Sequence, residues 1–225
     1  MEDKRLKEIR LEVEAQLVKM GEPLLTSKSY PDPHWYLNAC LSPGGGDWDI
    51  YAIGYKRAGD ILVQYVVDKK CDQDFLVYPI VFLYRQYLEL RLKELIFISS
   101  WLLDQGARIP RTHNLASLWR QARVGIEEVW PDKETKGYLN AMEARLEELC
   151  DIDSGSYAFR YPEDKEGGAT LAGLEHINLK QVSDVVQGMS HILDGSTTGM
   201  GEHLEAKQEM MAEYRAEMRS YYNEY

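Results

Sequence analysis

The sequence predicts an all-α protein: an up-down helical bundle of four to five core helices, with an aromatic loop, a minor extended segment and terminal helical arms. Three observations support this prediction. Apolar residues recur at three- and four-residue steps over most of the chain. Proline and glycine interrupt these runs at a few places, and the connections between the middle helices are short. The 225 residues suffice for one medium domain with appended arms.

The N-terminal region, residues 1–54, is predicted to be a helix followed by a loop. Residues 3–20 have one apolar face, and Gly21-Glu22-Pro23 ends the pattern. Residues 21–54 then contain four prolines and three consecutive glycines at 44–46, which exclude a regular helix. Because tryptophan and tyrosine in a loop usually cover part of a core, we expect an ordered aromatic loop with a mobile tip at the glycines.

The predicted bundle, residues 55–193, begins with a helix over 55–70 and a longer one over 72–104. The longer helix is apolar around most of its circumference, which is typical of the central helix of a bundle. A narrow polar stripe at i, i+4 and i+8 runs along it: Arg85, Glu89 and Lys93. We expect this stripe to be a solvated face. The alternative is a groove in which Arg85 is a second anion contact.

Three further helices are expected, each with an apolar stripe: residues 114–129, 132–149 and 178–193. Thr112 or His113 is the expected cap of the first of them. The segment 151–176 lies before the last one. Its alternation at Tyr157–Tyr161 predicts an extended segment, with a short hairpin to residues 170–174.

The C-terminal region, residues 200–225, is predicted to be a helical arm that follows a hinge-like link at 194–199. Apolar or aromatic residues recur in it at seven-residue intervals: Leu204, Met211, Met218 and Tyr225. That spacing resembles a coiled-coil seam or an arm that docks on a bundle. Because a row of apolar residues is not expected to stay exposed to solvent, we expect a homodimer or a protein complex through this arm.

The composition limits the classes of function. Lys plus Arg is 26 against 37 Asp plus Glu, a net charge of −11, so any nucleic-acid contact must be local. Three widely spaced cysteines without a CxxC pair indicate a reducing compartment and no zinc site. The chain shows no secretory pattern and no apolar run near the ~20 residues of a membrane span. We therefore expect a cytoplasmic protein with no membrane association, metal or cofactor.

The strongest candidate site is a cationic window over residues 105–126, which contains no acidic residue. Its basic residues are Arg108, Arg111, His113, Arg120 and Arg123. Arg111 and His113 flank a predicted helix start, where backbone N–H groups and the helix dipole favour an anion such as a phosphodiester. Alternatively, the arginines pair with nearby acids such as Glu127 or Glu143 and form a solvated ion-pair face.

The segment Arg108-Ile-Pro-Arg-Thr-His113 fits the pattern of arginine, four to six residues and histidine, and so resembles the HEPN superfamily. HEPN proteins are small α-helical bundles of prokaryotic toxin–antitoxin, abortive-infection and CRISPR-linked systems. Residues 113–119, His-Asn-Leu-Ala-Ser-Leu-Trp, and 159–162, Phe-Arg-Tyr-Pro, look like the His-x-Leu-x-x-Leu and Arg-Tyr-Pro segments of the HEPN bundles that accompany nucleotidyltransferases. With the long central helix, the resemblance covers about residues 55–193.

In HEPN ribonucleases, an arginine and a histidine from two subunits meet across a dimer groove and cleave RNA without metal. The resemblance therefore implies that His113 is the catalytic base or acid and that Arg108, with Arg111, holds the anion. The further anion- or RNA-binding candidates are Arg120, Arg123 and Arg160. The second resemblance instead makes His113 part of a structural turn, and the sequence leaves both roles open.

The implied protein belongs to a prokaryotic defence or toxin–antitoxin type system and binds RNA or nucleotides through a local Arg/His surface, as a metal-independent endoribonuclease. The alternative function is that of a non-catalytic structural or adaptor subunit whose acidic surface binds a protein partner. In that case the arginines of the cationic window form ion pairs with acidic residues of the same chain.

Overall fold

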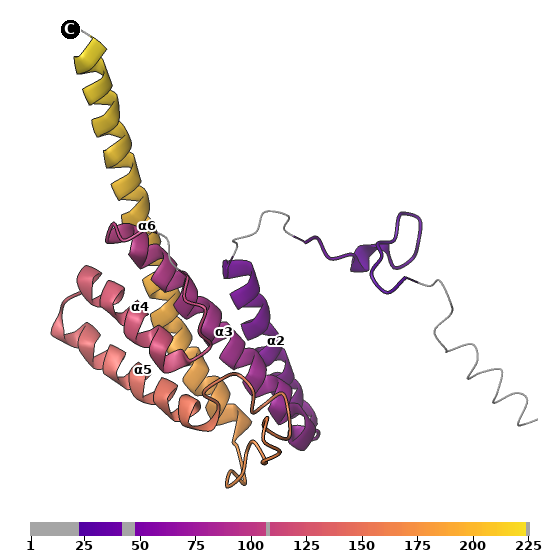
Figure 1. Ribbon diagram of the computed structural model, residues 1–225. Helices are drawn as coiled ribbons and strands as arrows, with labels where there is room; N and C mark the ends of the chain where they lie inside the picture. The colour runs from indigo at the N-terminus through magenta and orange to yellow at the C-terminus, as the bar shows by residue number, and fades with distance from the viewer. Residues whose placement is uncertain (1–22, 42–47, 107–108, 224–225) are drawn as a thin grey trace, which may run out of the picture. The chain divides into compact units, whose positions relative to one another are not determined.

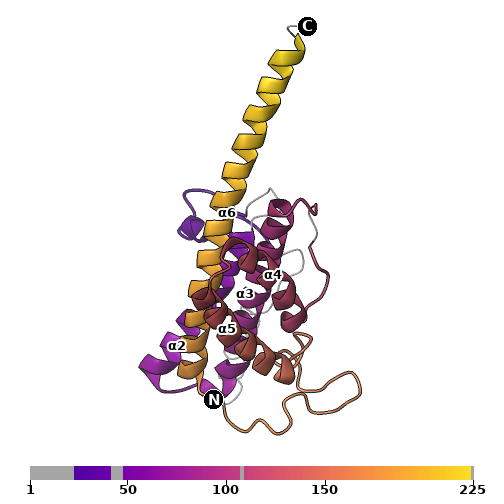
Figure 2. The same cartoon turned by 90° about the vertical axis from the view of Figure 1, so that its left-hand side faces the viewer.

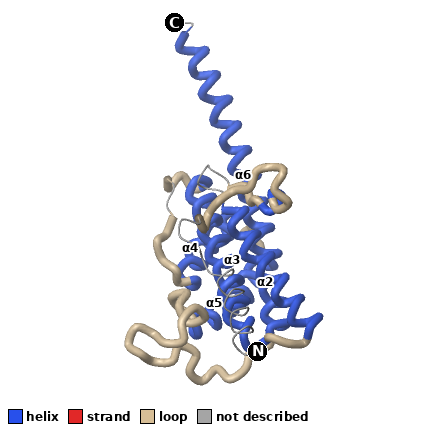
Figure 3. The backbone as a smooth tube through the Cα atoms, turned by 90° about the vertical axis from the view of Figure 1, so that its right-hand side faces the viewer, coloured by secondary structure: helices blue, strands red, loops and turns tan. Residues whose placement is uncertain are grey.

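The computed structural model describes residues 23–41, 48–106 and 109–223, and these residues form helices and loops. The chain divides into two units, Met1–Gly45 and Gly46–Tyr225. The predicted helix at 3–20 and the glycine tip at 44–46 lie outside the described residues. The elements are η1 (Trp35–Leu37), α2 (Trp48–Lys69), α3 (Gln73–Leu102), α4 (Leu115–Val129), α5 (Lys133–Ile152) and α6 (Leu179–Asn223). The all-α fold is confirmed, and none of the described residues is drawn as a strand (Figure 3).

Within the first unit, residues 23–41 form a turn around η1. The side chain of Asn38 accepts from the backbone N–H of Lys28 at 3.0 Å and donates to its carbonyl at 2.7 Å. Tyr30 and Trp35 meet edge to face, with ring centroids 6.4 Å apart. Both rings are exposed, and none of the described residues of this unit belongs to the buried core.

The second unit is a helical bundle around α3. This helix packs against α2, α4 and α6, while α5 packs on α4 (Figure 1). About half of its residues are buried, so the prediction of a central helix is correct. Helix α2 begins at Trp48 rather than at residue 55, because no proline interrupts the segment and Ala52 is buried in the core. No helix among the described residues is both long and apolar enough to cross a membrane.

The helices alternate in direction at all but one connection. Helices α2 and α3 are antiparallel, since Tyr84 bonds Asp60 while Arg91, further along α3, pairs with Asp49 near the start of α2. Helices α3 and α4 run the same way. His113, just before α4, contacts Glu89 of α3. Gly125, near the end of α4, lies against Ser99, further along α3, so closely that a Cβ on it would meet the Ser99 side chain. The up-down order is therefore interrupted between α3 and α4.

Two predicted features are wrong. The link at residues 194–199 is helical, because α6 continues unbroken through it. Packing explains this result: Ser196 and Met200 are buried, and Gly199 lies against the ring of Trp130, so tertiary contacts override the weak helix propensity of glycine. Beyond this packed part, α6 extends past the other helices of the bundle (Figure 2).

The predicted hairpin is also wrong. Residues 157–161 form a turn, in which the N–H groups of Arg160 and Tyr161 both donate to the carbonyl of Tyr157. The carboxylate of Asp153 accepts from the N–H groups of Tyr157 and Ala158 and thereby bends the chain. The only pairing of extended type described in this loop is an isolated bridge between Glu163 and Ala169.

Candidate functional site

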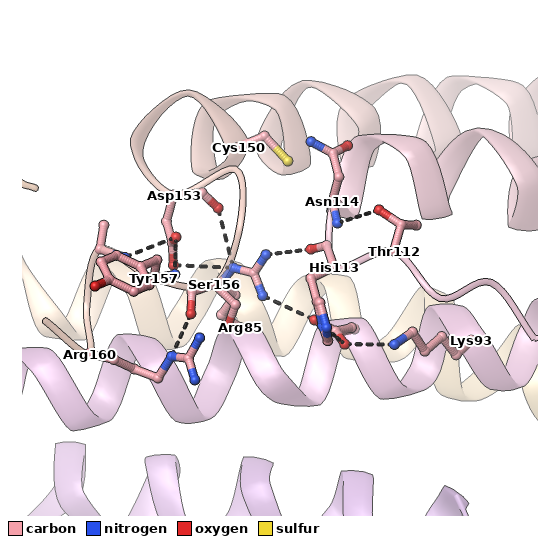
Figure 4. A network of polar contacts seen from close by, with 12 residues as sticks. Arg85, Lys93, Thr112, His113, Asn114, Cys150, Asp153, Ser156, Tyr157 and Arg160 are labelled. Carbon is pink, nitrogen blue, oxygen red and sulfur yellow. Dashed lines mark hydrogen bonds and ion pairs between the residues drawn. The ribbon is translucent and has the colours of Figure 1, made fainter. Parts of the chain in front are cut away.

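The polar stripe of α3 is buried, so the prediction of a solvated face is wrong. Arg85 is 0% exposed, Glu89 2% and Lys93 9%. Segments from distant parts of the chain cover the stripe: the residues before α4 and the turn after α5 (Figure 4). With His113 and Asp153, the three residues form what we call the α3 polar cluster.

Glu89 accepts bonds from three side chains. Its Oε1 lies 2.8 Å from Nζ of Lys93 and 2.8 Å from Nδ1 of His113, and its Oε2 lies 3.2 Å from Nη1 of Arg85. Burial alone would raise the pKa of Glu89, but the hydrogen bonds from Lys93 and His113 outweigh burial and hold this pKa below its ordinary value. The carboxylate is therefore charged at neutral pH and neutralises the buried cations around it.

Arg85 joins three parts of the chain. Besides Glu89, its Nη2 donates to the carbonyl of His113 at 2.6 Å, and its Nε lies 3.3 Å from Oδ2 of Asp153. The other carboxylate oxygen of Asp153 accepts from the backbone N–H of Tyr157 at 2.6 Å. The guanidinium consequently fixes both the entrance to α4 and the turn that follows α5 (Figure 4).

His113 is the exposed member of the cluster, with 62% of its side chain accessible. Because Glu89 is ionised and can only accept, Nδ1 of His113 carries the proton in this bond, and Nε2 is left with its lone pair. Nε2 has no hydrogen-bond partner among the described residues. In an imidazole held in this way, Nε2 is free to accept a hydrogen bond or a proton from a bound group.

The start of α4 is fixed by local capping. Asn114 is the N-cap, in place of the expected Thr112 or His113, and its Oδ1 accepts from Ser117 N at 2.8 Å. The N–H of Ala116 donates to Sγ of Cys150. Because these N–H groups are occupied, an anion near His113 would depend mainly on side-chain cations.

The arginines of the cationic window separate into different environments. Arg123 is neutralised by Glu127 at 2.7 Å and by Glu143, as in the alternative interpretation of the window. Arg120 is exposed and lies in a cavity of about 210 Å³ with Glu143 and Glu147 of α5. Both arginines therefore face α5, whereas His113 faces α3, so the structure does not bring them together.

Two arginines retain free charge near the cluster. Arg111, two residues before His113, is exposed and has no ion pair with any described residue. Arg160 is also exposed, and its Nε donates to the carbonyl of Ser156. No carboxylate of the described residues pairs with it. Figure 4 shows Arg160 and His113 on either side of Arg85, above the same face of α3. Arg108 lies outside the described residues.

The sequence pointed to His113 but missed that Glu89 is its partner and that Lys93 and Asp153 belong to the same cluster. One signal was available: three charged residues at four-residue spacing share one face of a helix that is apolar around most of its circumference. Charges at such positions are buried only when they are paired. Asp153 gave no comparable signal, because it meets Arg85 across 68 positions of sequence. No group of three or more His, Cys, Asp or Glu residues suited to a metal occurs in the described part of the chain.

Comparison of the chain with family models, with curated proteins and with solved structures gave no match.

Proposed function

We propose that this chain is a HEPN-like helical protein of a prokaryotic defence or toxin–antitoxin type system, and that it binds and cleaves RNA at His113 without a metal. One observation carries the proposal: an exposed imidazole whose Nδ1 is bonded to the buried, ionised carboxylate of Glu89. Arg111, two residues away and without an ion pair to any described residue, supplies a positive charge in a chain of net charge −11.

In the proposed cleavage of a phosphodiester, each group has its own role. Nε2 of His113 takes the proton of a ribose 2′-hydroxyl, and the 2′-oxygen forms a bond to the adjacent phosphorus. The bond from phosphorus to the 5′-oxygen breaks, and the leaving oxygen takes a proton from water. Arg111 stabilises the charge that develops on the phosphate oxygens. Glu89 is a positioning residue, which orients the ring through its bond to Nδ1.

The test is cleavage of labelled RNA in the presence of a chelator. His113→Gln should lose at least about a hundredfold in rate, because general acid–base catalysis contributes roughly that much. Arg111→Gln should weaken binding and cleavage together. His191→Gln is the matched control, since His191 is an exposed histidine on α6, away from Glu89. Equal rates for the His113 and His191 variants, or no cleavage by the wild-type chain, would refute the proposal.

A second candidate function, a non-catalytic subunit that assembles through the C-terminal arm, is favoured by the exposed end of α6. Lys207 ties α6 to the C-terminus of α3 by donating to the carbonyl of Leu102 at 2.7 Å. Beyond it, Met210, Met211 and Tyr214 are 63%, 42% and 57% exposed. Apolar side chains at coiled-coil spacing in this position favour a second copy of the arm as the partner.

Light scattering tests the assembly. The full chain should have the mass of a dimer, and a chain that ends at Lys207 should have the mass of a monomer. The double variant Met211→Glu/Met218→Glu should also be monomeric, because it places charges in the proposed seam. Ala216→Glu, on the opposite face of the helix, is the matched control and should stay dimeric. A monomeric full chain would contradict assembly through the arm.

A further inference from the structure

A cavity of about 490 Å³ lies between the start of α3 and the loop over residues 158–174. Its lining is mainly apolar and aromatic: Tyr78, Phe159, Tyr161, Pro162, Leu171 and Leu174. The volume is within the range of small-molecule sites, roughly 300–1,000 Å³. The loop is held in place by Thr170, whose hydroxyl contacts the carbonyls of Ala158 and Tyr161 at 3.1 and 2.7 Å. The cavity is thus formed before any ligand arrives.

Arg160 lies at this cavity and is anchored without being neutralised. Its guanidinium carbon is 5.6 Å from the ring centroids of both Phe82 and Tyr161, and its Nε is bonded to the carbonyl of Ser156. The terminal nitrogens have no acceptor among the described residues. By contrast, Arg85, Arg91 and Arg123 are all paired with carboxylates. A preordered, unpaired guanidinium is suited to a phosphate.

The aromatic residues at the cavity provide stacking surfaces. Tyr157 and Tyr161 are stacked, with centroids 4.4 Å apart and planes at 27°. Tyr161 and Tyr78 are 47% and 48% exposed, so ring surface remains accessible. Aromatic rings beside an arginine are the usual means by which proteins hold the bases and phosphates of single-stranded nucleic acids.

The cavity and the α3 polar cluster lie along one face of α3. Tyr78, Phe82, Arg85 and Glu89 are spaced by four, three and four residues, which places them on a common stripe. Eleven residues of helix separate Tyr78 from Glu89, about 16 Å at ~1.5 Å per residue. That length matches about five nucleotides of a stacked strand at ~3.4 Å each. One strand of RNA can therefore reach both places.

We propose that this cavity receives one unpaired base of the RNA, stacked on Tyr78 and Tyr161, while Arg160 binds the phosphate of the same strand. The inference rests on the proposed function and names its substrate class: single-stranded RNA. A base in a duplex is paired and stacked within the helix, so it does not enter the cavity. Arg160 and the two tyrosines act in specificity, and the proton transfer stays with His113.

The test measures binding by fluorescence anisotropy with the full chain, using a short labelled RNA alone and the same RNA annealed to its complement. The single strand should bind at least about tenfold more tightly than the duplex. Arg160→Gln and Tyr78→Ala should each weaken binding of the single strand by about five- to tenfold, since each removes one phosphate or stacking contact. Tyr161→Phe keeps the ring and should bind as the wild type does.

The controls separate this inference from the proposed function. Arg145→Gln removes an exposed arginine that is paired with Glu148 on α5, and it should leave binding unchanged. Because Tyr78 is exposed, Tyr78→Ala keeps the fold even if Arg160→Gln does not, which thermal melting will report. Equal binding of duplex and single strand, or unchanged binding in both Arg160→Gln and Tyr78→Ala, would overturn the subsite even where His113-dependent cleavage is found. Strand-selective binding that depends on Arg160 supports the subsite even where no RNA is cleaved, in which case only the endoribonuclease proposal fails.

Discussion

Helix α3 and the exposed end of α6 depart from the usual distribution of residues in opposite directions. Helix α3 buries charged side chains, Glu89 among them, whereas α6 beyond Lys207 exposes apolar ones such as Met211. Buried charge is costly unless it is paired, and exposed apolar surface is costly unless a partner covers it. The first departure is resolved within the described bundle by the α3 polar cluster. The second is not resolved there, which is why the two regions lead to different kinds of experiment.

The largest effect should follow from Glu89→Ala, which removes the carboxylate that pairs with Arg85 and Lys93 in the α3 polar cluster. Lys93 and Arg85 would lose a buried counter-charge, at a cost of about 3–5 kcal/mol in the free energy of unfolding. Denaturant-induced unfolding measures this. Glu148→Ala, at an exposed pair with Arg145, is the matched control and should cost less than about 1 kcal/mol. Similar costs for both variants would show that the cluster is not a buried ion-pair network.

A smaller effect should distinguish the face of α6 that packs on Trp130 from a face that meets no other residue. A Cβ on Gly199 would lie 2.7 Å from the ring of Trp130, whereas a Cβ on Gly201 meets nothing within 4 Å. We expect Gly199→Ala to lower the melting temperature, with a net cost of about 1–2 kcal/mol from overpacking. Gly201→Ala should instead stabilise by about 0.5–1 kcal/mol, because alanine is the better helix former. A shift of the melting temperature in the same direction for both variants would contradict the close packing of Gly199 on Trp130.

The smallest effect concerns the pH dependence of the α3 polar cluster. The folded-state pKa of Glu89 lies below the ordinary value of 4.5, so the carboxylate stabilises the fold above that pH. This contribution is lost as the pH falls through the lower, folded-state pKa. The stability difference between the wild-type chain and Glu89→Gln should therefore shrink as the pH falls below about 5. Urea unfolding at several pH values measures it, and a constant difference down to acid pH would contradict the assignment.

Much of the fold could be predicted because helical periodicity is a local property of the sequence. The central helix, the capped helices α4 and α5 and the packed part of α6 all follow from the spacing of apolar residues. The link at 194–199 was predicted wrongly, because its glycines signal a break locally while packing against Trp130 keeps the helix intact. The turn at Tyr157 was missed for a similar reason, since it depends on the carboxylate of Asp153.

The site was predictable only in its exposed part. His113 and Arg111 were identifiable from a cationic window in an acidic chain. Their surroundings depend on contacts across 24 positions, from His113 to Glu89, and across 68, from Arg85 to Asp153. Charge counting also could not show that Arg123 is neutralised while Arg160 pairs with no carboxylate of the described residues. Such differences follow from which helices become neighbours.

The three-way junction made by Arg85 has a consequence for which substitutions the chain can accept. A guanidinium is planar and directs its N–H groups outward in several fixed directions, and here they reach Glu89, His113 and Asp153 at once. A lysine ammonium is a compact point charge at the end of a flexible stem. It would leave at least one of these buried acceptors without a hydrogen bond. At this position, then, the shape of the cation matters more than its sign, and a lysine is not a conservative replacement.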